Sequence, residues 1–156
     1  MKNTVLILDQ SGSMAPPKRG QPSVLSSFEP AGVRVARRIH NRKEPLVMLR
    51  FGRRVTTQIS PSVDDVSKAF RAHVAYRDSN LKLALQKAEK LGSKRVYLFT
   101  DGKPNFPAKV LEQLEQMTGH GTCIVVIAPP SKGKEEPFLK QAAAVPGVKV
   151  LHLKPE

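Results

Sequence analysis

The sequence LILDQSGSM (Leu6–Met14) decides the fold, because an apolar run ends there in a turn that carries three side-chain oxygens. Asp9 follows the run, and Ser11 and Ser13 come after it at alternate positions with a glycine between them. A helix cap needs only one such oxygen, so the other two require a different reason. We therefore expect Asp9, Ser11 and Ser13 to form part of a binding site at the end of a buried strand.

A second apolar run, KRVYLFTDG (94–102), also ends in an aspartate, Asp101. Strands that are apolar throughout and alternate with helices are typical of a parallel sheet covered on both faces. In such open sheets, ligands bind outside the carboxyl ends of the strands, where the strand order reverses. If the two runs form neighbouring strands, Asp9 and Asp101 meet across that crevice.

Periodicity and turn residues predict the rest of the chain. The expected fold is α/β, with a doubly wound, Rossmann-like sheet of about six strands and helices on both faces, in a single domain over residues 1–156. The sheet is expected to be mostly parallel, and a hairpin at Gly52 and Arg53 would make one edge strand antiparallel. Ser62 is expected to cap a helix. Strands are predicted within 4–9, 45–52, 53–60, 94–102, 122–130 and 148–154. Helices are predicted within 62–75, 81–92, 107–119 and 135–145, and a further one starts at Ser27 or Glu29 and runs to Arg42.

The loop before the predicted 81–92 helix adds a third hydroxyl, that of Ser79. The three loops offer two carboxylates and three hydroxyls, from Asp9, Ser11, Ser13, Ser79 and Asp101. Hard oxygen donors of this kind suit Mg²⁺, Mn²⁺ or Ca²⁺ and do not suit zinc. We therefore expect Mg²⁺, Mn²⁺ or Ca²⁺ at this edge of the sheet.

Three short motifs resemble those of von Willebrand factor A domains. The segment Asp9–Ser13 matches the D-x-S-x-S motif, in its common D-x-S-G-S-M form. LFTDG (98–102) matches the strand-end T-D-G of the family, and RDSNLKLAL (77–85) occupies the place of its middle motif. The expected order of elements covers essentially the whole chain and matches the usual six strands of the family.

The resemblance implies a metal-ion-dependent adhesion site (MIDAS). In that family two serines and a threonine bind the cation directly, the aspartates often act through water, and an acidic residue of the partner completes the coordination shell. Carried over to this sequence, Ser11, Ser13 and Ser79 are ligands, and Asp9 and Asp101 lie beside or just behind them.

The middle motif departs from the family pattern at three positions. Ser79 stands in place of the usual threonine and keeps the hydroxyl oxygen, but its χ1 angle is less restricted. Arg77 and Asp78 stand where small glycines are usual. Asp78 could add a carboxylate to the site or pair with Arg77, and Arg77 could repel the cation or attract an acidic ligand. A family fold with an inactive metal site is therefore the alternative interpretation.

The chain is strongly basic, with 26 Lys and Arg against 13 Asp and Glu and a formal net charge of +13. Such a field attracts polyanions, whether nucleic acid, an anionic membrane or an acidic protein. Aromatic residues make up only 5% of the chain, whereas proteins that bind single strands rely on aromatic stacking, so we favour an acidic protein. The candidate polyanion contacts are Arg34, Arg37, Arg38, Arg42, Arg53 and Arg54.

The cysteine and hydropathy patterns favour a cytoplasmic protein. The single cysteine, Cys123, lies in the apolar run TCIVVIA (122–128), where we expect a buried structural thiol. The sequence contains no run of about 18 apolar residues that could span a membrane, and no signal-peptide pattern. The virion of a phage remains a second possible location.

These observations predict a non-enzymatic protein-interaction module that binds an acidic residue of its partner through a divalent cation. The resemblance implies a subunit of a larger intracellular assembly, including assemblies built on AAA+ ATPases. Neither a P-loop nor a G-x-S-x-G nucleophile elbow is present, which argues against those enzyme classes. The alternative function is that of a basic, nucleic-acid-associated protein that uses the same fold as a scaffold with an inactive metal site.

Overall fold

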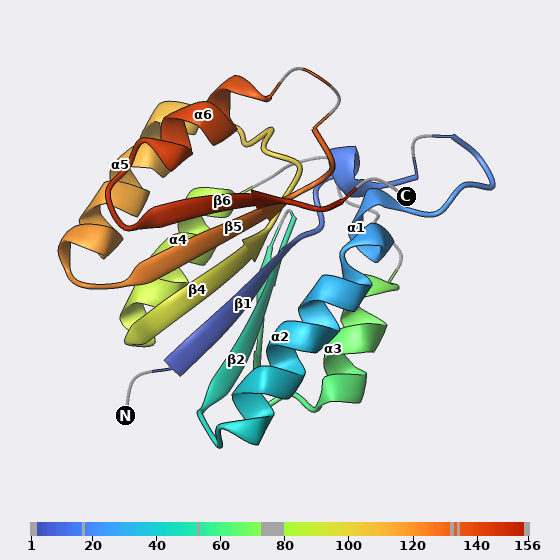
Figure 1. Cartoon of the computed structure of the whole chain (residues 1–156), viewed down its shortest axis with the longest axis horizontal. Helices are drawn as coiled ribbons and strands as arrows, with labels where there is room; N and C mark the ends of the chain where they lie inside the picture. The colour runs from blue at the N-terminus through green and yellow to red at the C-terminus, as the bar shows by residue number, and fades with distance from the viewer. Residues whose placement is uncertain are drawn as a thin grey trace.

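A mostly parallel sheet of six strands lies at the centre of the fold (Figure 1). The structure is a computed structural model, and it describes residues 3–16, 18–52, 54–72, 80–131, 133 and 135–154. The strands are β1 (Asn3–Asp9), β2 (Leu46–Phe51), β3 (Val55–Ile59), β4 (Ser93–Phe99), β5 (Cys123–Ala128) and β6 (Val148–His152). Their order is β3-β2-β1-β4-β5-β6, and β3 pairs antiparallel with β2 while the other pairs are parallel. The predicted doubly wound sheet with one antiparallel edge strand is therefore confirmed.

Helices cover the two faces of the sheet in two groups (Figure 1). They are α1 (Val24–Ser27), α2 (Glu29–Asn41), α3 (Val63–Phe70), α4 (Leu81–Lys90), α5 (Pro107–Gly119) and α6 (Pro137–Ala143), with a short 3₁₀ helix at Gly12–Met14. Buried residues of α4, α5 and α6 belong to one core cluster, and those of α1, α2 and α3 belong to a second cluster across the sheet. Among the described residues, no helix is both long enough and apolar enough to cross a lipid bilayer.

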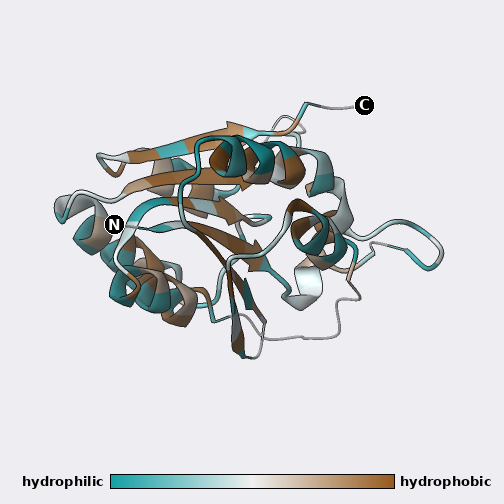
Figure 2. Cartoon of the chain, turned by 90° about the horizontal axis from the view of Figure 1, so that it is seen from below, coloured by the Kyte–Doolittle hydropathy of each residue, from teal (hydrophilic) through white to brown (hydrophobic). Residues whose placement is uncertain are grey.

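The central strand β1 is apolar throughout because both of its faces are covered. Val5 and Ile7 belong to the core on the α4–α6 side, and Leu6 and Leu8 belong to the core on the α1–α3 side. All four side chains are fully buried, and Figure 2 shows the strands as hydrophobic segments inside a more hydrophilic layer of helices. Each such side chain contributes about 1.5–3 kcal/mol by leaving water. This run therefore fixes the strand that delivers Asp9.

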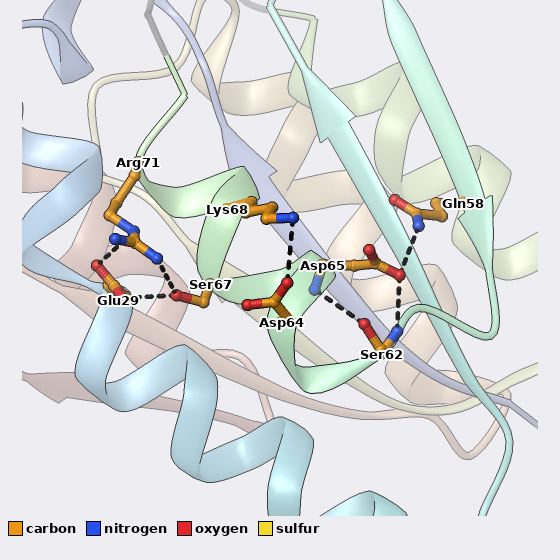
Figure 3. A network of polar contacts seen from close by, with 8 residues as sticks. All are labelled: Glu29, Gln58, Ser62, Asp64, Asp65, Ser67, Lys68 and Arg71. Carbon is orange, nitrogen blue, oxygen red and sulfur yellow. Dashed lines mark hydrogen bonds and ion pairs between the residues drawn. The ribbon is translucent and has the colours of Figure 1, made fainter.

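Helices α2 and α3 are held together by one close packing contact and one polar network. Gly32 of α2 leaves room for the Phe70 ring of α3, since a Cβ atom at that glycine would collide with the ring. Ser67 Oγ donates a 2.7 Å hydrogen bond to Glu29 Oε1 and accepts one of 3.0 Å from Arg71 Nη2 (Figure 3). Helix α2, which carries three of the six predicted basic residues, is therefore held to α3 by both contacts.

The predicted cap of α3 is confirmed as a capping box. Ser62 Oγ accepts a 3.0 Å hydrogen bond from the N–H of Asp65, and Asp65 Oδ2 accepts one of 2.9 Å from the N–H of Ser62 (Figure 3). The side-chain amide of Gln58 on β3 donates to the same carboxylate oxygen at 3.1 Å. The hydrogen bonds from Ser62 lower the pKa of Asp65. The cap therefore also ties α3 to the antiparallel edge strand.

The prediction of a buried thiol at Cys123 is wrong, because this side chain is exposed. On the α4–α6 side of β5, Ile124 and Val126 are buried in the core. The opposite side of the strand is left partly open, so Cys123 is exposed and Val125 is only half-buried. The apolar run around Cys123 is therefore fully covered on one face only.

Candidate metal centre

The turn after β1 holds its two serines in place through short-range contacts. The N–H of Ser11 donates a 2.8 Å hydrogen bond to Asp9 Oδ1. Met14 is fully buried in the α1–α3 core, and its N–H donates to the carbonyl of Ser11 at 2.9 Å. The turn between these anchors brings Ser11 Oγ and Ser13 Oγ to 3.2 Å from each other. Since Ser11 is buried and Ser13 is exposed, this pair of hydroxyls lies at the boundary between the interior and solvent.

The two predicted aspartates lie at the same edge of the sheet, because β4 is the parallel neighbour of β1. Both strands end there, β1 at Asp9 itself and β4 just before Asp101. The Asp101 carboxylate is also largely buried, and its Oδ1 accepts a 3.2 Å hydrogen bond from the N–H of Lys103. The two apolar runs therefore form neighbouring strands, which was the condition for Asp9 and Asp101 to lie close together.

Thr100 is a site residue that the sequence interpretation missed. It is fully buried, and its Oγ1 donates a 2.8 Å hydrogen bond to Asp9 Oδ2. The same oxygen accepts a 3.2 Å hydrogen bond from the N–H of Gly102. The signal lay in the T-D-G motif itself, where the threonine precedes the predicted aspartate. One hydroxyl thus joins the loop after β1 to the loop after β4.

Gly102 allows α6 to pack directly against the loop that carries Asp101. Its φ angle is +81°, a conformation that glycine adopts without steric cost. A Cβ atom at this position would lie 2.6 Å from Leu139 Cγ of α6. The glycine is therefore required both by the backbone conformation and by the neighbouring helix.

Asp9 is the more deeply buried of the two acids, with only 2% of its surface exposed. This burial raises its pKa from 3.8 to about 6, although hydrogen bonds from Ser11 and Thr100 oppose the shift. The negative charge of Asp101 raises the pKa of Asp9 further. A cation beside Asp9 would favour its charged form and remove this electrostatic cost. The site is therefore suited to bind positive charge.

The oxygen donors at this edge fit a hard divalent cation. Two carboxylates and a pair of serine hydroxyls are the ligand types that Mg²⁺, Mn²⁺ and Ca²⁺ accept. Across the part of the chain that the structure describes, no three His, Cys, Asp or Glu side chains form a metal-binding group. A cation held here by Asp9 and Asp101 would therefore also depend on the hydroxyls of Ser11 and Ser13.

The third predicted loop lies outside the described residues, which resume at Asn80. Ser79, Asp78 and Arg77 all belong to the interval 73–79, so their places at the site stay predictions. Helix α4 starts at the same edge of the sheet as Asp9, because its other end leads through a two-residue turn into β4. Asn80 caps that start, with its Oδ1 accepting a 3.2 Å hydrogen bond from the N–H of Leu83.

The fold matches solved structures at low sequence identity. The SpRpn10 VWA domain aligns with 100% of this chain and 89% of its own length, at 12% identity and a TM-score of 0.65. The chain has the von Willebrand factor A (VWA) fold. No protein-family model matches the sequence, and no curated protein is similar to it, so the likeness is one of fold.

Two further structures with the VWA fold contain metals. Manganese-loaded TRAP of Plasmodium vivax aligns at 19% identity and a TM-score of 0.69, over 97% of this chain and 68% of TRAP. Proximal thread matrix protein 1 of the mussel byssus, with zinc in its MIDAS motif, aligns at 16% identity and a TM-score of 0.65. That match covers 97% of this chain and 44% of the mussel protein, so the chain spans less than half of its length.

The predicted basic residues lie at separate places on the VWA fold of this chain. Four of them are exposed along and just after α2, around a hollow of about 430 Å³: Arg34, Arg37, Arg38 and Arg42. Arg54 is exposed beyond the far end of β2, at the edge of the sheet where Asp9 lies. Arg53 lies outside the described residues. The four arginines on and just after α2 therefore form one exposed basic surface, and Arg54 lies apart from it.

Proposed function

We propose that residues 1–156 form a single VWA-type interaction domain that binds an acidic side chain of a partner protein through a divalent cation. The proposal rests on the pair of Ser11 and Ser13 hydroxyls, whose oxygens lie 3.2 Å apart beside the buried carboxylates of Asp9 and Asp101. Ser11, Ser13 and Ser79 are the proposed direct ligands, and Asp9 and Asp101 are proposed to hold the cation from beside or just behind them. In this proposal the domain binds and does not catalyse, as the resemblance in the sequence implies.

Mg²⁺ is the proposed ion, because all of the proposed ligand atoms are oxygens. The manganese of Plasmodium vivax TRAP and the zinc of the mussel protein support a divalent cation in this fold. The serine hydroxyls are neutral, so the bound ion keeps much of its positive charge. Its open coordination position therefore prefers a carboxylate from outside the chain.

An acidic partner is further supported by the net charge of +13, which speeds encounter with a negative surface. Arg77 and Asp78 are proposed as rim residues of the site. The partner would present one Asp or Glu at the centre of its contact surface, as one member of a multi-subunit assembly. Losing that acid should cost more affinity than losing any charge at the rim, since the cation would be left unpaired in a desolvated interface.

Thermal unfolding in the presence of different cations tests the metal site. Saturating Mg²⁺ should raise the melting temperature by several degrees, because an ion that binds only the folded state stabilises it. Ser13→Ala should reduce this increase, since it removes an exposed ligand without opening the core. Ser27→Ala is the matched control, because Ser27 is also exposed and bonds only to its own helix. An unchanged melting temperature with Mg²⁺, Mn²⁺, Ca²⁺ and Zn²⁺ would show that the site is inactive.

The role of Ser79 is tested by two substitutions. Ser79→Ala should weaken metal binding, because it removes one oxygen from the shell. Ser79→Thr should tighten it modestly, because a β-branched side chain has fewer χ1 rotamers to lose. If both variants bind Mg²⁺ like the wild type, Ser79 is not a ligand and Asp78 becomes the candidate.

Contact with nucleic-acid phosphates is a second candidate function, favoured by the four exposed arginines around the hollow on α2. Such binding should weaken steeply with increasing salt and should not respond to EDTA. Metal-bridged binding to a protein should be lost in EDTA and in the Asp101→Ala variant. Binding that survives both treatments but disappears in Arg37→Glu would favour the nucleic-acid candidate.

A further inference from the structure

One face of the sheet is incompletely covered, and the open part forms a groove. The groove has a volume of about 600 Å³ and runs between α2 and the strands β4, β5 and β6. Its floor is apolar and includes Tyr97, Val125, Ile127 and Leu151. These four residues lie in register on three neighbouring strands, with Tyr97 beside Val125 and Ile127 beside Leu151. The floor is therefore one continuous patch of the sheet surface.

The apolar floor is partly open to solvent, since Tyr97 and Ile127 are buried but their neighbours Val125 and Leu151 are not. Leu151 is 43% exposed and Val125 is half-buried, whereas on the opposite face of the same strands Val126 is fully buried. The exposed Cys123 continues the same open face toward the start of β5. An apolar hollow with charged residues at its rim has the form that receives the apolar stripe of an amphipathic segment.

The rim of this groove is basic. Arg34 and Arg38 line one side from α2, and Lys154 lines the other side beyond β6. Lys149 points to the same face of β6 as Leu151, because residues two apart on a strand share a face. Among the described residues that line the groove, none is an aspartate or a glutamate. An occupant that complements this surface needs an apolar stripe flanked by acidic side chains.

We propose that this groove docks an amphipathic helix of a partner protein, with its apolar stripe on the sheet and acidic side chains facing Arg34, Arg38 and Lys154. A helix is the natural occupant, because the rest of both sheet faces is covered by helices in the same layer. A second copy of this chain fits poorly, because each copy carries a net charge of +13. This surface is separate from the proposed metal site and does not depend on it.

Fluorescence anisotropy with designed peptides tests the proposal, with EDTA present throughout to exclude metal bridging. The probe is a labelled helix-forming peptide of about 18 residues, with leucines on one stripe and glutamates on both flanks. It should bind with a micromolar Kd. A peptide of the same composition with the leucines dispersed should bind at least roughly tenfold more weakly, because the loss of a single leucine contact has that effect. A peptide with lysine in place of glutamate should not bind.

Substitutions in the groove locate the binding surface, and each has a matched control elsewhere. Leu151→Ser should weaken binding of the acidic peptide, and Leu83→Ser should not, since Leu83 is similarly exposed (41%) but lies on α4 across the sheet. Arg38→Glu should also weaken binding, whereas Lys87→Glu, the same charge change on exposed α4, should change it far less. Circular dichroism melting curves of all four variants establish that they are folded. If Leu151→Ser fails to fold, Leu151→Thr replaces it, because threonine favours a strand.

Three results would overturn the proposal. If the dispersed peptide binds as tightly as the amphipathic one, the surface recognises negative charge alone. If a single-stranded oligonucleotide binds to the wild type and to Leu151→Ser but not to Arg38→Glu, the surface binds phosphates. If sedimentation shows a dimer of the wild type that Leu151→Ser dissociates, the occupant is a second copy of this chain.

Discussion

Thr100 Oγ1 donates a 2.8 Å hydrogen bond to Asp9 Oδ2, which joins two residues that are 91 positions apart in the sequence. Both residues are buried, and both stand where a central parallel strand ends. The bond orients the carboxylate of Asp9 while the N–H of Ser11 binds its other oxygen. The proposed metal centre would therefore depend on a contact between the loops after β1 and β4, in addition to the proposed ligands themselves.

Thr100→Val should weaken Mg²⁺ binding and destabilise the protein by about 1–2 kcal/mol, since it leaves buried hydrogen-bonding groups without their partner. Valine has nearly the same shape, so the fold should persist. Thr122→Val is the matched control, because Thr122 is also buried and its hydroxyl donates to the carbonyl of Ser93, away from the site. Urea unfolding and Mg²⁺ titration of both variants provide the measurement. Equal loss of Mg²⁺ affinity in the two variants would show that Thr100 has no particular role at the site.

Asp9→Asn should stabilise the metal-free protein at pH 7.5 and abolish its response to Mg²⁺. The pKa of Asp9 is raised in the folded state from 3.8 to about 6, so the folded state binds more protons than the unfolded state between these values. The free energy of unfolding should therefore fall as the pH rises from about 4 to about 6. Asparagine does not ionise and avoids this loss of up to about 3 kcal/mol.

Urea unfolding in EDTA at pH 4 and pH 7.5 measures this effect. The Asn variant and the wild type should differ little at pH 4, and the variant should be more stable at pH 7.5. With saturating Mg²⁺ the order should reverse, because only the wild type gains from the cation. A variant that is less stable than the wild type at pH 7.5 in EDTA would contradict the electrostatic cost assigned to Asp9.

Gly102→Ala should destabilise the protein more than Gly121→Ala. Both glycines have positive φ angles, +81° and +92°, so both substitutions strain the backbone by about 1–2 kcal/mol. A Cβ atom at Gly102 would also collide with Leu139, whereas no atom lies within 4 Å of the corresponding position at Gly121. This overpacking should add about 1–3 kcal/mol and should lower Mg²⁺ affinity by displacing the loop of Asp101. Equal melting temperatures of the two variants would show that α6 moves to accommodate the added Cβ atom without loss of stability.

The pair of His152 and Glu135 should make stability depend on pH above the unfolded pKa of 6.5. His152 Nδ1 lies 2.8 Å from the carbonyl oxygen of Pro129, and Nε2 lies 3.0 Å from Glu135 Oε1. Both partners only accept hydrogen bonds, so both ring nitrogens must carry protons, and the pKa of His152 is raised, first by its bond to Glu135. The stabilisation is complete below the unfolded pKa of 6.5 and is lost as the pH rises through the raised value.

The Glu135→Gln variant tests this dependence. Its melting temperature should change less than that of the wild type between pH 6 and pH 9, because the carboxylate no longer favours the charged ring. The difference should be below about 1 kcal/mol, since the pair is partly exposed and screened by solvent. Parallel pH profiles of the two proteins would exclude a stabilising charge on His152.

The local sequence was enough to predict the elements around the site. Val5–Leu8 is apolar at every position, so this strand had to be covered on both faces, and its neighbours had to be parallel strands joined by helices. Asp9 and Asp101 could be placed together because the two runs that carry them end in the same way. The cap at Ser62 is a short-range pattern and was likewise predicted from the sequence, whereas the reciprocal bond from its N–H to Asp65 was seen only in the structure.

The support of the site could not be predicted in the same way. Thr100 was visible in the T-D-G motif, but its bond to Asp9 depends on which strands are neighbours. The need for glycine at position 102 follows from Leu139, which reaches the loop only after α6 has packed. Both features involve residues that are far apart in the chain, and no local periodicity encodes such distances.

The sequence by itself determined which residues can be buried, and the tertiary structure decided which of them are. Val126 and Val125 are chemically identical neighbours in one apolar run, yet the first is fully buried and the second lines an open groove. The physical reason is that burial needs two surfaces, and the covering helices come from distant parts of the chain. For the same reason Cys123 is exposed. The arginines of α2 likewise lie beside the apolar floor of the groove, which is formed by strands from a later part of the chain.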